Sequence, residues 1–149
     1  MKVLISSCLM GEAVRYDGKS KKRFDFDKRF EYHLLCPEIL GGLSVPREAC
    51  EIVNDKVISA SGKDLTEAFN TGANAVIEYI QKHQIEMVVL KQNSPSCGSR
   101  FIYDGSFKKR KIEGMGVTAR LLKQHKIKVL DETQWLAYIR KGVVIDESI

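Results

Sequence analysis

Short apolar runs alternate with amphipathic stretches along the chain. Residues 2–6, 85–91 and 127–130 are apolar runs of strand length that end in polar or small residues, a pattern typical of buried strands. Residues 64–83 carry apolar side chains at three- and four-residue steps, which predicts one buried face of a long helix. Strand patterns and helix patterns therefore follow one another from the N-terminus onward.

The remaining segments continue this alternation. Residues 117–124 and 133–140 have helical spacing, and residues 24–35, which mix aromatic and charged side chains, are predicted to hold a further helix. Residues 101–107 fit a strand or the edge of a hairpin, and the basic run 108–111 fits a loop. The alternation favours an α/β fold, with a mainly parallel, Rossmann-like sheet and helices on both of its faces.

The cysteines follow the predicted strands. Cys8 comes just after the first strand, Cys97 just after the second, and Cys36 follows another apolar run. In parallel α/β folds, ligands bind outside the carboxyl ends of the strands, so these three cysteines are expected at the site. Cys50 has a different setting, within the sequence VPREACEI.

Composition favours a globular protein. The chain has 149 residues, 44% of them hydrophobic and 29% charged, and no apolar run is long enough to span a bilayer. One lysine precedes the first apolar run, as in a signal peptide, but Ser6 and Ser7 interrupt that run early. We therefore expect a first strand and a cytoplasmic protein. Disulfides are not expected in that compartment.

Charge and cysteine spacing narrow the possible ligands. The net charge of +5 permits an anionic ligand, but the chain lacks the aromatic and basic interleaving of a nucleic-acid stacking surface. Thiolates suit zinc, copper(I) or iron–sulfur clusters, and three protein ligands leave one position open for a substrate. No Cys-x-x-Cys pair occurs. Spacing alone leaves two readings open: ligation by three cysteines, and inert buried cysteines.

Four motifs carry a family resemblance. They are SSCLMGEAVRYDG (6–18), CPEILGGLSVPREACEI (36–52), LKQNSPSCGS (90–99), and IYDGSF followed by GMGVTARLL (102–122). In this order they resemble the 2-thiouracil desulfurases, also called thiouracil desulfidases, from residue 2 to about residue 132. Longer members of that family carry a further domain, which this chain is expected to lack, so that residues 1–149 form a single desulfidase-like iron–sulfur domain.

The resemblance implies a cofactor and a reaction. Cys8, Cys36 and Cys97 match the cysteines that hold a 4Fe–4S cluster in the desulfidases, and Cys50 matches no required position. The implied reaction replaces sulfur by oxygen, without redox change, in a small thiolated uracil base, nucleoside or nucleotide. Glu38 matches a residue that would act as general base toward water, and Ser94 one that would hydrogen-bond the substrate or its sulfur.

Two interpretations are open for each of the other candidate residues. Arg15, Asp17 and Arg47 are candidate substrate-binding residues, or Asp17 forms an ion pair with one of the arginines. Ser96 is a further candidate for substrate binding, with closure of the turn beside Pro95 as the favoured alternative.

Three further alternatives stay open. Glu38 could instead cap a helix. The stretch 116–118 could hold an anion at a helix start, or Thr118 could be a plain cap. The alternative function is a structural or sensory zinc or iron–sulfur protein, in which a structural zinc would need Cys50 or a histidine as fourth ligand.

Overall fold

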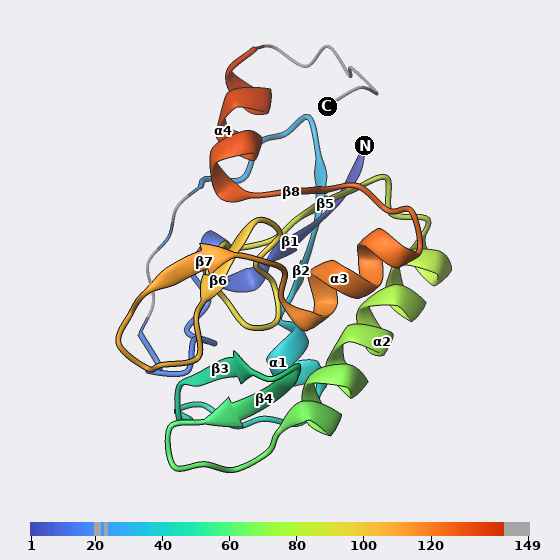
Figure 1. Ribbon diagram of the computed structural model, residues 1–149. Coiled ribbons are helices and arrows are strands. Elements are labelled where there is room, and N and C mark those ends of the chain that lie inside the picture. The colour runs from blue at the N-terminus through green and yellow to red at the C-terminus, as the bar shows by residue number, and fades with distance from the viewer. Residues whose placement is uncertain (20–21, 23, 142–149) are drawn as a thin grey trace.

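A four-stranded parallel sheet forms the centre of the protein (Figure 1). The computed structural model describes residues 1–19, 22 and 24–141. The strand order is β2-β1-β5-β8, and all neighbours run parallel. The strands are β1 (Lys2–Ser6), β2 (Glu31–Leu35), β5 (Met87–Val89) and β8 (Val129–Leu130).

Helices cover both faces of this sheet, as the sequence predicts. α2 (Thr66–His83) and α3 (Val117–Gln124) pack on one face, where they enclose Leu4, Val88 and Leu90. α4 (Glu132–Arg140) packs on the other face, where Trp135 and Tyr138 join Val3, Ile5 and Val89 in a second core cluster. Successive residues of a strand point to opposite faces, so one apolar run supplies both clusters. The predicted α/β, Rossmann-like fold class is confirmed.

Two hairpins and two short helical segments complete the described chain. The remaining elements are η1 (Ser7–Met10, a 3₁₀ turn), α1 (Pro37–Leu40), β3 (Cys50–Val53), β4 (Lys56–Ser59), β6 (Phe101–Tyr103) and β7 (Lys111–Glu113). β6 and β7 pair antiparallel, which confirms the predicted hairpin edge. No helix in the described residues is long and apolar enough to cross a membrane.

The helix predicted for residues 24–35 is wrong. Residues 31–35 form β2, which pairs with β1 from Lys2↔Glu31 to Ser6↔Leu35. Phe24 and Phe30 are buried in the α4 side of the core, and Phe30 contacts the Trp135 ring with centroids 5.0 Å apart. The mixture of aromatic and charged residues therefore belongs to a core-packed loop followed by an edge strand, where polar side chains are tolerated.

The order of strands reverses direction between β1 and β5. The chain passes from β1 to β2 on one side, then returns through α2 to β5 on the other side of β1 (Figure 1). In open α/β sheets such a reversal leaves a crevice beyond the carboxyl ends of the two central strands.

α1 contacts α2 backbone to backbone through two glycines. A Cβ atom on Gly41 would overlap the carbonyl oxygen of Ala68, and one on Gly72 would overlap the carbonyl oxygen of Pro37. Glycine inside a helix costs about 1 kcal/mol relative to alanine, but here it permits a contact that no other residue allows. This contact fixes α1 below the end of β2.

We expect Gly72→Ala to destabilise the protein although alanine favours helices. The added methyl group must push α1 away from α2, which costs roughly 1–3 kcal/mol as other overpacked sites do. Urea denaturation followed by circular dichroism measures the change. Thr71→Ala, at the exposed neighbouring position of α2, is the matched control and should be neutral or slightly stabilising. Equal midpoints for the two variants would contradict the close contact.

Candidate active site

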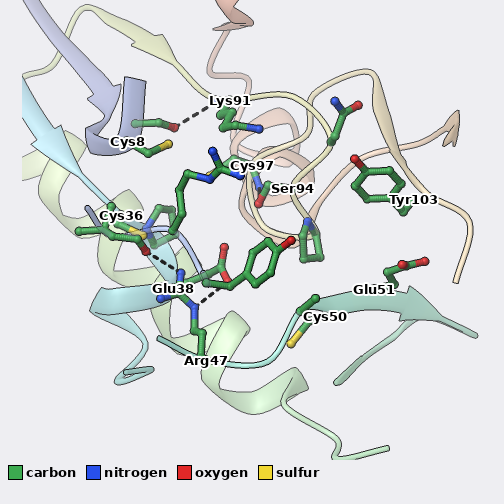
Figure 2. Close-up of a pocket in the computed structure, with 18 of the residues that line it drawn as sticks. Cys8, Cys36, Glu38, Arg47, Cys50, Glu51, Lys91, Ser94, Cys97 and Tyr103 are labelled. Atoms are coloured by element: carbon green, nitrogen blue, oxygen red, sulfur yellow. Dashed lines mark hydrogen bonds and ion pairs between the residues drawn. The ribbon is translucent and has the colours of Figure 1, made fainter. Parts of the chain in front are cut away.

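A cavity of about 270 Å³ opens beyond the carboxyl ends of β1, β2 and β5. Figure 2 shows it with the side chains that border it. One side is formed by the segments that follow the three strands, and the other by β3 and the β6–β7 hairpin. Its lining includes all four cysteines, together with Arg15, Glu38, Arg47, Glu51, Lys91, Ser94, Tyr103, Phe107 and Lys109.

Cys8 reaches the cavity from the turn after β1. It lies in η1, which ends at Gly11 with a φ of 98°, a conformation that glycine adopts without steric cost. Burial raises the pKa of the Cys8 thiol to about 11, against the opposing charge of Lys91. The thiol is therefore protonated at neutral pH in the metal-free protein.

Cys36 reaches the cavity from the residue before α1. Its backbone is extended, with φ of −124°, and Pro37 starts the helix with a preset φ. Burial raises the pKa of the Cys36 thiol, while the backbone amide of Ile39 lowers it by hydrogen bonding to the sulfur. The sulfur is thus held over the first turn of α1.

Cys97 lies in a tight loop after β5. The Ser94 hydroxyl oxygen accepts hydrogen bonds from the amides of Ser96 and Cys97, at 3.0 and 3.1 Å. A Cβ on Gly98 would approach the Ser94 carbonyl oxygen to 3.0 Å and would overlap the Phe101 carbonyl oxygen. The loop therefore requires a serine at its start and a glycine at its end.

The N-terminus of α3 clamps this loop. The amides of Val117 and Thr118 donate to the carbonyl oxygens of Pro95 and Ser96, both at 2.8 Å. These first-turn amides would otherwise have no partner within the helix. Of the alternatives for residues 116–118, the structure supports neither an anion site nor a plain cap, because the amides hold the Cys97 loop.

The thiols of Cys8, Cys36 and Cys97 lie close enough to influence one another. Burial raises the pKa of Cys97 most, and the neighbouring Cys36, Glu38 and Cys8 raise it further. Burial also raises the pKa of Cys50 to about 11, but the next contribution comes from Glu38, and the Cys50 sulfur contacts the Glu48 carbonyl oxygen at 3.7 Å. Cys50 borders the cavity without joining the other three thiols.

The donor chemistry of these three thiols suits an iron–sulfur cluster. Among the described residues, no three His, Cys, Asp or Glu side chains are grouped so as to hold one metal ion. An iron–sulfur cluster asks for separate soft thiolates arranged around it, each on its own iron. Three cysteines from three different loops at one cavity provide that donor set.

Glu38 lies beside the thiols in the first turn of α1. Its carboxyl accepts a hydrogen bond from Arg47 Nε at 3.2 Å. Burial raises the pKa of this carboxyl above its ordinary value, while the Arg47 charge and hydrogen bonds from Arg47 and Ser94 oppose the shift. Arg47 is itself fixed, because its other nitrogens donate to the carbonyl oxygens of Ser44 and Val14, both at 2.9 Å. The carboxyl thus faces the cavity rather than solvent.

Comparison with known proteins shows which family the chain belongs to. A model of the 2-thiouracil desulfurase family matches residues 3–134. The chain belongs to the 2-thiouracil desulfurase family. It is 43% identical over 148 residues to the YbbK protein of Bacillus subtilis (strain 168), whose function is uncharacterised, covering 89% of this chain and 96% of that protein. The family resemblance drawn from the four motifs is confirmed.

A solved structure shares both sequence and fold with this desulfurase family member. It is a [4Fe-4S]-dependent thiouracil desulfidase, TudS, at 37% identity with a TM-score of 0.83. The match covers 95% of this chain and 99% of the TudS chain. That desulfidase chain therefore has no substantial part outside the match.

Two predicted substrate-binding residues do not border the cavity. The Asp17 carboxylate pairs with Arg15 at 3.3 Å and accepts the Lys19 amide at 3.0 Å, which is the ion-pair alternative. Ser96 is 1% exposed, and its hydroxyl bonds the Thr118 hydroxyl at 2.8 Å. The geometry thus favours a structural role for Ser96 in the loop, whereas Arg15 and Arg47 do line the cavity.

Four cavity residues were missed at the level of sequence. Lys91 is the second residue after β5, a position that the strand-end argument could have included. Tyr103 and Phe107 lie within the motif IYDGSF, whose sequence pattern indicates only a strand or a hairpin edge. The sequence does not indicate Glu51 as a cavity residue, because its contacts are to backbone amides more than 50 residues away.

We expect Ser96 and Thr118 to be coupled in a double-mutant cycle. Ser96→Ala leaves the Thr118 hydroxyl buried without this partner, and Thr118→Ala does the reverse, so each should lower the free energy of unfolding by roughly 1–3 kcal/mol. The double variant should lose less than the sum, with a coupling of at least about 0.5 kcal/mol. Urea denaturation of the four proteins gives these values. Strictly additive losses would show that the two hydroxyls do not stabilise one another.

Proposed function

We propose that this protein is an iron–sulfur-dependent desulfidase that converts the C=S group of a thiolated uracil to C=O. One observation carries the proposal: three cysteines from the ends of three adjacent parallel strands line a single cavity, with Glu38 and Ser94 beside them. The family match and the similarity to a [4Fe-4S]-dependent thiouracil desulfidase support it.

Cys8, Cys36 and Cys97 would hold a 4Fe–4S cluster. Such a cluster, bound by three thiolates, supplies one iron without a protein ligand, which acts as a Lewis acid toward a thiocarbonyl sulfur. Because the burial of the three thiols raises their pKa, each must lose its proton when it binds iron. Lys91, whose charge lowers the pKa of Cys8, favours the thiolate form there.

Glu38 takes the proton from the attacking water. Its buried carboxyl has a raised pKa, which makes the carboxylate a stronger base than an exposed glutamate. Arg47 keeps one carboxyl oxygen oriented. Ser94 hydrogen-bonds the carboxyl and can turn its hydroxyl toward the substrate, since its oxygen is already fixed by two loop amides.

The overall reaction is a hydrolysis. Water oxygen forms the new bond to the ring carbon, the carbon–sulfur bond breaks, and sulfur leaves as hydrosulfide. No electrons are gained or lost, so no reductant is needed. The substrate is a thiolated uracil as free base, nucleoside or nucleotide, and residues 1–149 act as a single iron–sulfur domain. A reducing cytoplasm suits the four free cysteines.

Anaerobic reconstitution tests the cofactor and the reaction together. The protein should take up about four iron atoms per chain and release hydrosulfide from 2-thiouracil. Cys8→Ser, Cys36→Ser and Cys97→Ser should each lose both properties, because a hydroxyl is a poor substitute for a soft thiolate. Cys50→Ser is the matched control and should keep both. Full iron without hydrosulfide release would favour the structural or sensory alternative, and loss of iron in Cys50→Ser would overturn the ligand assignment.

Replacing Glu38 should separate catalysis from cofactor binding. Glu38→Gln keeps the shape of the side chain but cannot accept the proton, so iron content should stay while turnover falls by roughly 10²–10⁴-fold. Ser94→Ala should give a smaller loss, since it removes a hydrogen bond but no proton acceptor. Iron per chain and the rate of hydrosulfide release are measured for each variant. Full activity of Glu38→Gln would reduce Glu38 to an ion-pair partner of Arg47.

A further inference from the structure

The tip of the β6–β7 hairpin forms the wall of the cavity opposite the cysteines. The Asp104 amide donates to the Arg110 carbonyl oxygen at 2.8 Å, which closes the hairpin and leaves residues 105–109 as its tip. Phe107 and Lys109 from this tip, and Tyr103 from β6, line the cavity. In Figure 2, Tyr103 lies across the pocket from Cys8 and Cys36.

The backbone of this tip has an unusual shape. Gly105, Phe107 and Lys109 all have positive φ values, of 92°, 61° and 58°. Phenylalanine and lysine rarely adopt this left-handed conformation, which is unfavourable for residues with a Cβ. Within the hairpin, Asp104 Oδ1 accepts the Ser106 amide at 2.9 Å and Ser106 Oγ accepts the Lys108 amide at 3.3 Å, and a contact from outside the hairpin adds to these.

Glu51 of β3 supplies such a contact. One carboxylate oxygen, Oε1, accepts hydrogen bonds from the amides of Gly105 at 2.9 Å and Phe107 at 3.2 Å. Backbone amides that converge on one anion form a concave binding site of the type called a nest. Glu51 is only 8% exposed, so these bonds form away from bulk water.

The tip also lies directly on β3. A Cβ at Gly105 would come within 2.8 Å of the Ile52 carbonyl oxygen, so only glycine permits this approach. Glu51 therefore connects two structures that are distant in sequence: the strand that carries Cys50, and the hairpin tip that carries Phe107.

We infer that Glu51 is a positioning residue that holds Phe107, which lines the cavity together with Tyr103 of β6, as part of an aromatic wall for the substrate ring. The inference rests on the proposed function and concerns binding rather than the chemical step. Aromatic side chains stack on pyrimidine rings, and the loss of one such contact lowers affinity by roughly 5- to 100-fold. Glu38 and the three thiols come from other segments, so this wall can be weakened without disturbing them.

Glu51→Ala and Glu51→Gln in the reconstituted holoprotein test the inference. A single oxygen accepts both bonds, so glutamine can keep them and alanine cannot. Glu51→Ala should raise the KM for 2-thiouracil by about 5- to 100-fold, with kcat changed by less than about twofold and iron per chain unchanged. Glu51→Gln should restore most of the affinity. The exposed Glu113→Ala in β7 is the matched control and should behave as the unaltered protein.

Two further measurements on these variants, amide hydrogen exchange and uracil binding, do not depend on catalytic turnover. Amide hydrogen exchange of peptides covering residues 104–110 should be faster in Glu51→Ala by about tenfold or more, and normal in Glu51→Gln. Calorimetric binding of uracil should weaken in parallel with the KM. If the unaltered protein releases no hydrosulfide, the proposed function fails, while exchange and uracil binding still decide the role of Glu51.

Phe107→Ala tests the same aromatic wall directly, by removing one of its side chains. It should raise the KM as Glu51→Ala does while leaving iron intact, and it decides the case if Glu51→Ala fails to take up iron. An unchanged KM and unchanged uracil binding in Phe107→Ala would overturn the inference. Normal amide exchange in Glu51→Ala would also overturn the inference. A loss of affinity in Glu51→Gln as large as in Glu51→Ala would overturn it too, because it would mean that the negative charge itself acts on the substrate.

Discussion

Parallel pairing of β1 with two neighbouring strands determines where the candidate active site lies. Ile5 is paired with Leu34 of β2 on one side and with Val89 of β5 on the other, so the three strands end at nearly the same level. The segments that leave these ends carry Cys8, Cys36 and Cys97 into one cavity. Any slip of register along β1 would displace one cysteine by about 3.3 Å per residue, which a shared cluster would not tolerate.

The loops after the strands are then fixed by backbone contacts rather than by charge. α1 lies against α2 because Gly41 and Gly72 have no side chains, and the Cys97 loop is held by the first amides of α3. Both contacts are made with α2 and α3, which pack on the same face of the sheet. The cysteines are thus placed by the rigid part of the molecule. In the metal-free protein these thiols carry raised pKa values, so the proposed binding of a cluster would have to release their protons.

The sequence pattern predicted an element correctly where the spacing of apolar residues alone determines it. Apolar runs predicted the buried strands, and helical spacing predicted α2, α3 and α4 to within about two residues, the usual uncertainty of helix ends. The pattern failed for residues 24–35, because the short polar–apolar alternation of β2, in which Glu31 and His33 alternate with Tyr32 and Leu34, follows directly on a loop rich in aromatic and charged residues. It gave no indication of Glu51 as a cavity residue, and it did not reveal the partner of Ser96, whose favoured role in closing the loop agrees with its buried position. Their partners are Thr118 and the amides of the hairpin tip, which only the tertiary fold brings near.

The two sides of the cavity therefore have different origins. The segments that follow the parallel strands supply thiols, a carboxyl and a hydroxyl, whereas the antiparallel hairpin supplies aromatic and basic side chains from a tip whose amides bond to the buried Glu51 carboxylate. If the three cysteines hold the cluster and the hairpin tip binds the substrate ring as proposed, changes in residues 105–109 should alter which thiolated compound is bound while leaving the cysteines in place. A family built on this arrangement can keep one chemistry and vary its substrate through the hairpin, since loops tolerate substitution better than the elements that support them.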